Sequence, residues 1–174
     1  MSVDRSTMRD TLRFWASGVS VVATLAPQGQ PAYPYAGMTV SSLMSLSLEP
    51  AQILVSLAKQ STTTESVLAS KIFSVSILTA EQAALADRFA GRSDLSAHQN
   101  RFDGVAVVTA ATGAPILQEA LAWLDCRVVS VHDGSTHWIV VGEVVAASHR
   151  EDAASPLIYF NRAYASITPE REQS

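Results

Sequence analysis

Apolar and polar positions alternate along most of the chain in the way that β-strands require. Residues 19–25 are rich in β-branched side chains, and residues 71–78 alternate apolar with small polar side chains. Two longer runs, 121–132 and 137–147, are joined by the turn residues 133–136 and predict a hairpin. The remaining predicted strands cover residues 32–40, 53–57, 105–108, 116–117 and 157–160.

One amphipathic helix is predicted at the N-terminus. Met8, Leu12 and Trp15 are spaced by four and three residues, which places them on one face of a helix. We expect Ser6 or Thr7 to cap this helix, because a hydroxyl oxygen accepts from the free N–H groups of a first turn. The apolar stripe predicts that the helix packs against another surface.

Two further helices are predicted between strands. The hydroxyl run from Ser61 opens one of them, and Thr79 caps the other. Residues 91–104 follow neither period, and a loop of this length predicts a mobile flap or rim. Strands outnumber these scattered helices, so the pattern predicts a mainly β protein, a small antiparallel barrel with peripheral helices.

Composition limits the classes of function. The 174 residues suit one domain spanning 1–174, and 48% are hydrophobic while only 16% are charged, so we expect a second copy to cover part of the surface. A net charge of −4 without a Lys/Arg block argues against a nucleic-acid partner. The sequence shows neither a signal peptide nor an apolar run of the roughly 18 residues that a membrane span needs, which predicts a cytoplasmic protein.

Several familiar catalytic motifs are missing from the sequence. Neither a Gly-x-Gly fingerprint nor a P-loop is present, so a nucleotide would have to bind in another way. Four scattered histidines and the single Cys126 form no recognisable ligand set, and we expect no metal site. Gly-x-Ser-x-Gly, the nucleophile turn of many hydrolases, is absent as well.

Hydroxyl side chains are concentrated in the stretch 37–64. Residues 61–64 lie where a helix begins, so its free N–H groups, these hydroxyls and the cation of Lys59 suit a phosphate. The same hydroxyls could instead cap the helix, and the spacing alone favours caps. Further hydroxyls upstream support a ligand site, although a Ser/Thr-rich edge strand explains them too; they belong to Thr39, Ser41, Ser42 and Ser47.

Six short motifs occur in the order and spacing of one known family. They cover residues 14–22, 37–42, 45–50, 59–63, 87–91 and 142–144. Over residues 8–166 the chain resembles the flavin reductase-like, FMN-binding split-barrel family. The resemblance implies an antiparallel split β-barrel and a homodimer in which NADH or NADPH reduces free FMN or FAD, commonly for a separate monooxygenase.

The resemblance also implies which residues bind the flavin. Those expected to contact the isoalloxazine ring are Thr39, Val40, Ser41 and Ser42, with a further flavin contact from Ser47. Those expected to form the phosphate-binding turn are Lys59, Ser61, Thr62 and Thr63. Arg88 and Phe89 match a pair that lies near the flavin, although Phe89 suits a core position equally well.

His137 matches the family histidine that lies near the nicotinamide. Ser135 and Thr136 precede it where the family has Gly-Asp, so an ordinary polar residue at a hairpin end is the other interpretation. In the implied reaction the two cofactors perform hydride transfer to flavin N5, and no catalytic acid or base is required. A flavin carrier that does not oxidise NADH is the main alternative, and an oxidase with bound FMN fits the order of motifs less well.

Overall fold

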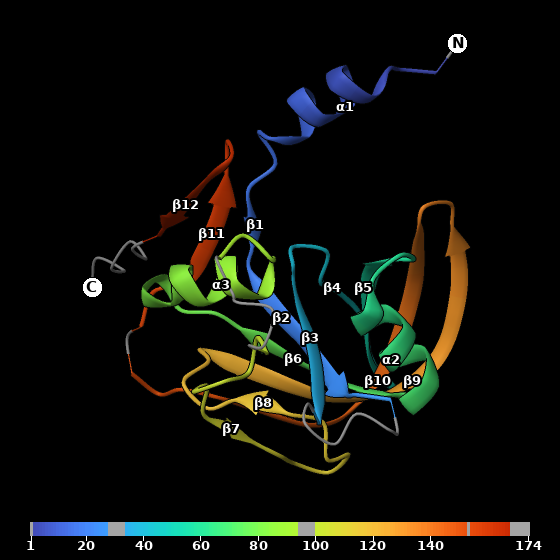
Figure 1. The fold of residues 1–174 in the computed structure, drawn as a ribbon, viewed down its shortest axis with the longest axis vertical. Helices are drawn as coiled ribbons and strands as arrows, with labels where there is room; N and C mark the ends of the chain where they lie inside the picture. The colour runs from blue at the N-terminus through green and yellow to red at the C-terminus, as the bar shows by residue number, and fades with distance from the viewer. Residues whose placement is uncertain (1, 28–33, 94–99, 153, 168–174) are drawn as a thin grey trace.

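A seven-stranded antiparallel sheet forms most of the molecule in the computed structural model, which describes residues 2–27, 34–93, 100–152 and 154–167 (Figure 1). In spatial order its strands are β3 (Tyr35–Val40), β2 (Ser20–Leu25), β6 (Ile72–Ile77), β9 (Ala122–Gly134), β10 (His137–His149), β5 (Ala51–Ala58) and β4 (Met44–Leu48). All neighbouring pairs are antiparallel. The predicted mainly β, antiparallel split barrel with peripheral helices is therefore confirmed.

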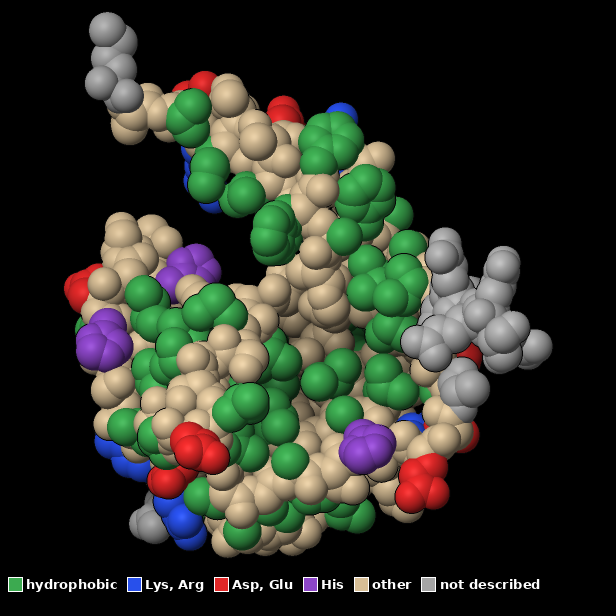
Figure 2. All heavy atoms as spheres, turned by 180° about the vertical axis from the view of Figure 1, so that it is seen from behind, with side chains coloured by type: hydrophobic (Ala, Val, Ile, Leu, Met, Phe, Trp, Pro, Cys, Tyr) green, Lys and Arg blue, Asp and Glu red, His purple; other side chains and the backbone are tan. Residues whose placement is uncertain are grey.

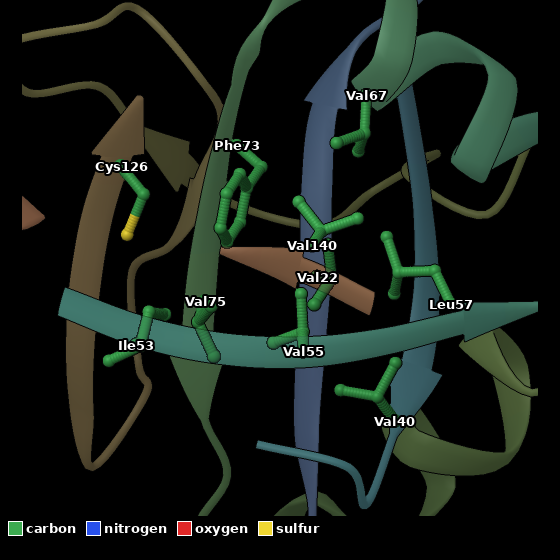
Figure 3. Packing of buried hydrophobic residues seen from close by; sticks show 10 residues of the cluster. All are labelled: Val22, Val40, Ile53, Val55, Leu57, Val67, Phe73, Val75, Cys126 and Val140. Carbon is green, nitrogen blue, oxygen red and sulfur yellow. The ribbon is translucent and has the colours of Figure 1, made fainter. Parts of the chain in front are cut away.

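Alternation along the strands builds the barrel interior. In β5, Ile53, Val55 and Leu57 are buried while the residues between them are partly exposed. Figure 3 shows these side chains among others from β2, β3, β6, β9, β10 and the helix α2 (Thr62–Ser70) in one apolar cluster. Cys126 of β9 belongs to this cluster, and burial raises the pKa of its thiol to about 12, so it acts as a packing residue.

The remaining elements lie outside the large sheet. Its small neighbours are β1 (Ser17–Gly18), β11 (Leu157–Phe160) and β12 (Ala163–Ser166) in one sheet, and β7 (Val107–Val108) and β8 (Ile116–Leu117) in another. The other helices are α1 (Arg5–Leu12), the 3₁₀ turn η1 (Ala80–Gln82) and α3 (Ala83–Phe89). None of the helices in the described parts of the chain has the length and apolar character of a membrane span.

The barrel is split between β3 and β4. These strands are the two edges of the large sheet, yet they are consecutive in the chain and joined only by residues 41–43. So short a connection spans at most about 14 Å between the flanking Cα atoms, which brings both edges together at this end. Ser42 fixes the connection to β5, because its hydroxyl donates to the carbonyl of Ser56 at 2.8 Å and accepts from the Ser56 N–H at 3.2 Å.

The N-terminal arm, residues 2–16, projects away from the barrel (Figure 1). The carboxylate of Asp4 caps α1 by accepting from the N–H groups of Ser6 at 2.9 Å and Thr7 at 3.0 Å. The prediction that Ser6 or Thr7 is the cap is therefore wrong, since an acid just upstream fills that position. Trp15 lies beyond the last helical residue. None of the residues of this helix is buried, so the described parts of the chain do not cover its apolar face.

Most other predicted elements are confirmed within a few residues. The hairpin of β9 and β10, the helix that opens after Ser61 and the capping role of Thr79 all appear as predicted. The strand predicted at 53–57 is longer, and β4 and β12 were not predicted at all. Residues 32–33 of a predicted strand and 94–99 of the predicted flap lie outside the described residues.

Candidate functional site

The ring segment, residues 39–42, comprises the last two residues of β3 and the first two of the connection at the split of the barrel. Thr39 donates its hydroxyl to the carbonyl of Ala86 in α3 at 2.6 Å, which ties β3 to that helix. Val40 is buried in the barrel core, whereas Ser41 is exposed. Residues 41–43 belong to no strand, so their backbone groups stay outside the sheet ladder and are available to a ligand.

Gly37 allows the segment to sit this close to α3. A Cβ atom at this position would lie 2.9 Å from ring carbons of both Phe89 and Phe102. These two rings pack edge to face at 4.8 Å, and Arg101 donates to the carbonyls of Gly37 and Phe89 at 3.0 Å each. The glycine is therefore required by close packing beneath the ring segment rather than by its backbone angles.

The phosphate turn, residues 59–63, lies next to the ring segment. The side chain of Met38 contacts the hydroxyls of Ser61 at 3.5 Å and Thr64 at 4.0 Å, which joins β3 to the start of α2. Ser61 occupies the N-cap position, but its side chain makes no capping hydrogen bond. The first helical hydrogen bond runs from the N–H of Glu65 to the carbonyl of Ser61, so the N–H groups of residues 62–64 precede it.

These observations bear on the two interpretations of the hydroxyl run, helix caps or a phosphate site. If the run served only as a cap, the Ser61 hydroxyl would accept from the first turn, and it does not. Thr62 is exposed, whereas Thr63 is buried, so its hydroxyl is not exposed to a ligand. The helix start therefore retains the positive end of its dipole and unpaired donors, as an anion site requires.

Lys59 places a cation beside this helix start. Its ammonium group lies 2.9 Å from a carboxylate oxygen of Asp133 and 4.3 Å from the ring centre of Trp138. The hydrogen bond from Lys59 holds the pKa of Asp133 below its usual value. The pair joins β5 to the tip of the β9–β10 hairpin and fixes where the cation sits.

His137 and Lys59 line one pocket. The first residue of β10 is His137, which stands opposite Ala58 of β5, and the N–H of Lys59 donates to the carbonyl of Thr136 at 3.1 Å. The pocket has a volume of about 830 Å³ and is open to solvent. The His137 Nδ1 atom lies 2.9 Å from the hydroxyl of Thr136, and the ring is exposed. The predicted nicotinamide residue and the predicted phosphate turn are thus neighbours.

Two more pockets adjoin the ring segment on its other side. One, of about 880 Å³, lies between the arm and the barrel, where Figure 2 shows a hollow beside apolar side chains of the arm. The other, of about 130 Å³, is lined by residues that include Thr39, Val40, Ser41, Arg92, Tyr159 and Tyr164. The two share Ser41 and Tyr159, and the large one shares Arg5 with the His137 pocket. The large pocket therefore adjoins each of the other two.

Seven of the predicted residues, all in described parts of the chain, do not line these three pockets: Ser42, Ser47, Ser61, Thr62, Thr63, Arg88 and Phe89. Ser47 lies on the edge strand β4, so the edge-strand interpretation applies to this residue. Phe89 is fully buried in the cluster around α3, which places it at the core position that its pattern allowed. Arg88 donates to the carbonyls of Asn100 at 3.1 Å and Asp103 at 2.7 Å, which holds the turn after residue 99.

Sequence reasoning missed Arg92, Tyr159 and most of the arm as lining residues. Arg92 follows the motif 87–91 directly, in a stretch that matched no period. Tyr159 belongs to β11, whose pairing with β1 and β12 depends on contacts distant in the chain. A cation just after a recognisable motif was the one local signal available.

The donor set fits a flavin mononucleotide. Such a ligand presents a flat ring with a polar edge and a terminal dianion. The helix start and Lys59 would supply the charge and the donors for the dianion, while Ser41 and Arg92 line a pocket that would take one end of the ring. The pockets are also within the size range of small-molecule sites.

Comparisons with known proteins agree with this geometry. The family model described as flavin reductase like domain matches residues 12–168. The FMN reductase (NADH) RutF 2 of Rhizobium rhizogenes is 33% identical over 91% of this chain and 87% of its own length. The reductase subunit HsaB of a flavin-dependent monooxygenase from Rhodococcus jostii is 32% identical over 98% of this chain and 82% of its own.

A solved structure shows the same likeness. The NADH:FAD oxidoreductase SgcE6 of Streptomyces globisporus, in complex with NAD and FAD fragments, superposes with a TM-score of 0.83. It is 29% identical in sequence, and the match covers 97% of this chain and 96% of that one. The solved structure therefore has the same fold as this chain, and the names of RutF 2 and SgcE6 each combine a flavin with NADH.

Proposed function

The chain belongs to the flavin reductase-like domain family, and from this premise we propose that it catalyses the reduction of free FMN or FAD by NADH. The observation that carries the proposal is the unpaired start of α2 with Lys59 beside it, next to the open backbone of residues 41–43. A separate flavin-dependent monooxygenase would take up the reduced flavin, as the name of the relative HsaB indicates for that protein.

The cofactors supply the redox chemistry, a hydride from the nicotinamide to flavin N5. We infer that residues 39–42 hold the flavin ring and that residues 59–63 hold its phosphate. His137, which lines the same pocket as Lys59, would orient the nicotinamide over the flavin ring. The barrel wall beneath the ring segment excludes water from one side of the ring. These assignments require the chain to bind and position the flavin and the nicotinamide, and they require no proton transfer from it.

An anaerobic mixing experiment tests the activity. Protein, FMN and NADH are combined without oxygen, and the visible absorbance of the flavin is followed. The reductase bleaches the flavin far faster than the protein-free mixture does. A carrier would bind the flavin, seen as a change in its fluorescence, and leave the bleaching rate at the protein-free value.

A substitution of His137 tests the nicotinamide assignment. His137→Ala should raise the KM for NADH about tenfold and change the Kd for FMN much less, because the His137 side chain hydrogen-bonds Thr136 rather than the phosphate turn. His149→Ala, at the exposed far end of the same strand, is the matched control. An unchanged KM for NADH in His137→Ala would remove this residue from the site.

We also propose that the functional unit is a homodimer formed through the arm. Its large apolar side chains are unusually exposed for a monomer, with Trp15 at 75%, Phe14 at 59%, Leu12 at 53% and Met8 at 49%. Edge strand β4 adds a second apolar surface, where Leu48 is 86% exposed. An α-helix without a buried residue is not stable by itself at eight residues, so the arm needs a partner surface.

A further inference from the structure

The small pocket beside the ring segment contains one charged group. Of the described residues that line it, Arg92 is the only ionisable one besides Tyr159 and Tyr164. Thr39, Val40 and Ser41 of the ring segment line the same pocket. Arg92 comes three residues after the end of α3, so α3, which packs under Gly37, also positions the Arg92 side chain.

The size and polarity of the pocket select which part of a flavin it admits. At about 130 Å³ it is much smaller than the 300–1,000 Å³ of a typical ligand site, so only one end of the ring fits. The dimethylbenzene end of the ring is apolar, whereas the pyrimidine end carries two carbonyls and ring nitrogens. A guanidinium and two phenols suit the pyrimidine end, and the rest of the ring extends into the larger pocket through the shared Ser41.

The guanidinium of Arg92 is held in place by its neighbours. A carboxylate oxygen of Asp87 lies 3.6 Å from the guanidinium, and the backbone carbonyl of Asp87 accepts the backbone N–H of Arg92 at 2.9 Å. The hydroxyl of Tyr164 donates to the same carboxylate oxygen at 2.9 Å. Tyr159 stacks against the guanidinium at 5.7 Å, and hydrogen bonding with Tyr159 raises the pKa of Arg92. Still, 56% of the side chain remains exposed, so its donors are not all used.

The charge balance of the reaction makes this position consequential. Hydride transfer takes NADH and neutral flavin to NAD⁺ and a reduced flavin that carries one negative charge, with no proton required from the protein. That charge is spread over N1 and the C2 carbonyl at the pyrimidine end. A fixed cation there interacts with the product far more strongly than with the neutral oxidised flavin.

We propose that Arg92 binds the N1–C2 carbonyl edge of the flavin and selectively stabilises its reduced, anionic form. The inference rests on the proposed function, and it assigns Arg92 a role that the motif residues Arg88 and Phe89 do not fill, since Arg88 is committed to backbone carbonyls and Phe89 to the core. The competing explanation is that Arg92 only ties α3 to the β11–β12 hairpin through Asp87 and Tyr159.

Binding of the two redox states separates these explanations. The Kd of oxidised FMN and of FMN reduced with dithionite is measured anaerobically for the wild type and variants. Arg92→Gln should weaken reduced FMN about tenfold and oxidised FMN less than threefold, and Arg92→Lys should restore most of the preference. Arg150→Gln, an exposed arginine paired with Asp152 and Glu119 and absent from the lining of all three pockets, should change neither Kd.

The experiment also distinguishes a failed inference from a failed function. Dithionite reduces the flavin, so both Kd values are obtained whether or not the protein oxidises NADH. Equal losses for the two redox states in Arg92→Gln, or no loss in either, would overturn the proposal and leave Arg92 a structural tie. Asp87→Asn adds a second test, because it releases the guanidinium without removing its charge. It should therefore lower the preference for reduced FMN by less than Arg92→Gln does.

Discussion

Individual hydroxyl groups in the stretch 37–64 have different tasks. Thr39 and Ser42 use theirs to bind the carbonyls of Ala86 and Ser56, so they shape the ring segment rather than face a ligand. Ser61 does not cap its helix, and this one missing bond leaves the helix start open. Spacing in the sequence could not separate these roles, since the acceptors of Thr39 and Ser42 are 47 and 14 residues away.

Lys59 gives the first prediction at the scale of a residue. Lys59→Gln should weaken the binding of FMN about tenfold, or about 1.4 kcal/mol, because a charge-assisted contact to the phosphate is lost. Riboflavin, which lacks the phosphate, should bind equally well to both proteins. Fluorescence titration with each flavin measures this. Lys71→Gln, at the opposite end of the same helix, is the control, and equal losses for FMN and riboflavin would refute the placement.

Arg92 shows the limit of local inference at this scale. The motif 87–91 was recognisable, but the side chain of Arg88 donates to backbone carbonyls and the ring of Phe89 lies in the core. The cation that faces the pocket lies just after the motif and owes its position to Asp87, Tyr159 and Tyr164. A role that depends on contacts between elements distant in the chain leaves no periodic pattern or motif spacing in the sequence.

Strands with a regular apolar pattern were the ones that the sequence predicted well. β5 alternates because one of its faces lies in the barrel, and the β9–β10 hairpin combines two long runs with a clear turn. β6 alternates in sequence although both of its faces are buried, since Ser74 and Ser76 are as inaccessible as Phe73 and Val75. β4 was missed because its side chains are exposed or half-exposed on both faces, so no alternation marks it. β12 was missed because it is four residues long and pairs only with β11.

Gly142 of β10 gives a prediction about sheet packing. A Cβ atom here would lie 2.5 Å from the ring of Phe73, which is fully buried and has no room to move. Gly142→Ala should therefore destabilise the protein by about 1–3 kcal/mol in denaturant-induced unfolding. Gly18→Ala, where a Cβ atom meets nothing within 4 Å, should stay close to the wild type. Equal stabilities of the two variants would contradict the packing argument.

The contact between β12 and α3 predicts a dependence of stability on pH. Burial and the hydrogen bond to Asp87 raise the pKa of Tyr164 from 10.0 to about 12. A raised pKa stabilises the fold while the phenol is protonated, so this contribution is complete below pH 10 and is lost as the pH rises toward 12. The difference in unfolding free energy between wild type and Tyr164→Phe should shrink across that window. A difference that stays constant from pH 10 to 12 would argue against the shift.

At the scale of the whole molecule, the arm is the feature whose large apolar side chains stay exposed, although its Asp10, Arg13 and Phe14 contact the β11–β12 hairpin. Its apolar stripe was predicted, but the surface that covers it was not, because a stripe indicates burial without naming the neighbour. The arm also borders two of the three pockets through Arg5. Assembly and ligand binding are therefore expected to be coupled.

Trp15→Glu tests the dimer. A charge in place of this 75% exposed ring should shift the protein from dimer toward monomer in analytical ultracentrifugation, since burying an unpaired carboxylate is costly. Val108→Glu, on β7 at the end of the molecule away from the arm in Figure 1, should leave the mass unchanged. A wild type that sediments as a monomer, or a Trp15→Glu variant that remains dimeric, would show that the arm has another role.

Turnover with flavin in excess tests the central claim most directly. The purified protein is mixed with NADH and a large excess of free FMN or FAD in air, and the NADH consumed per chain is counted. An enzyme that reduces and releases flavin consumes many equivalents of NADH for each chain, in proportion to protein concentration. Consumption at the rate of the protein-free mixture, while flavin binds, would contradict the account and identify a flavin carrier instead.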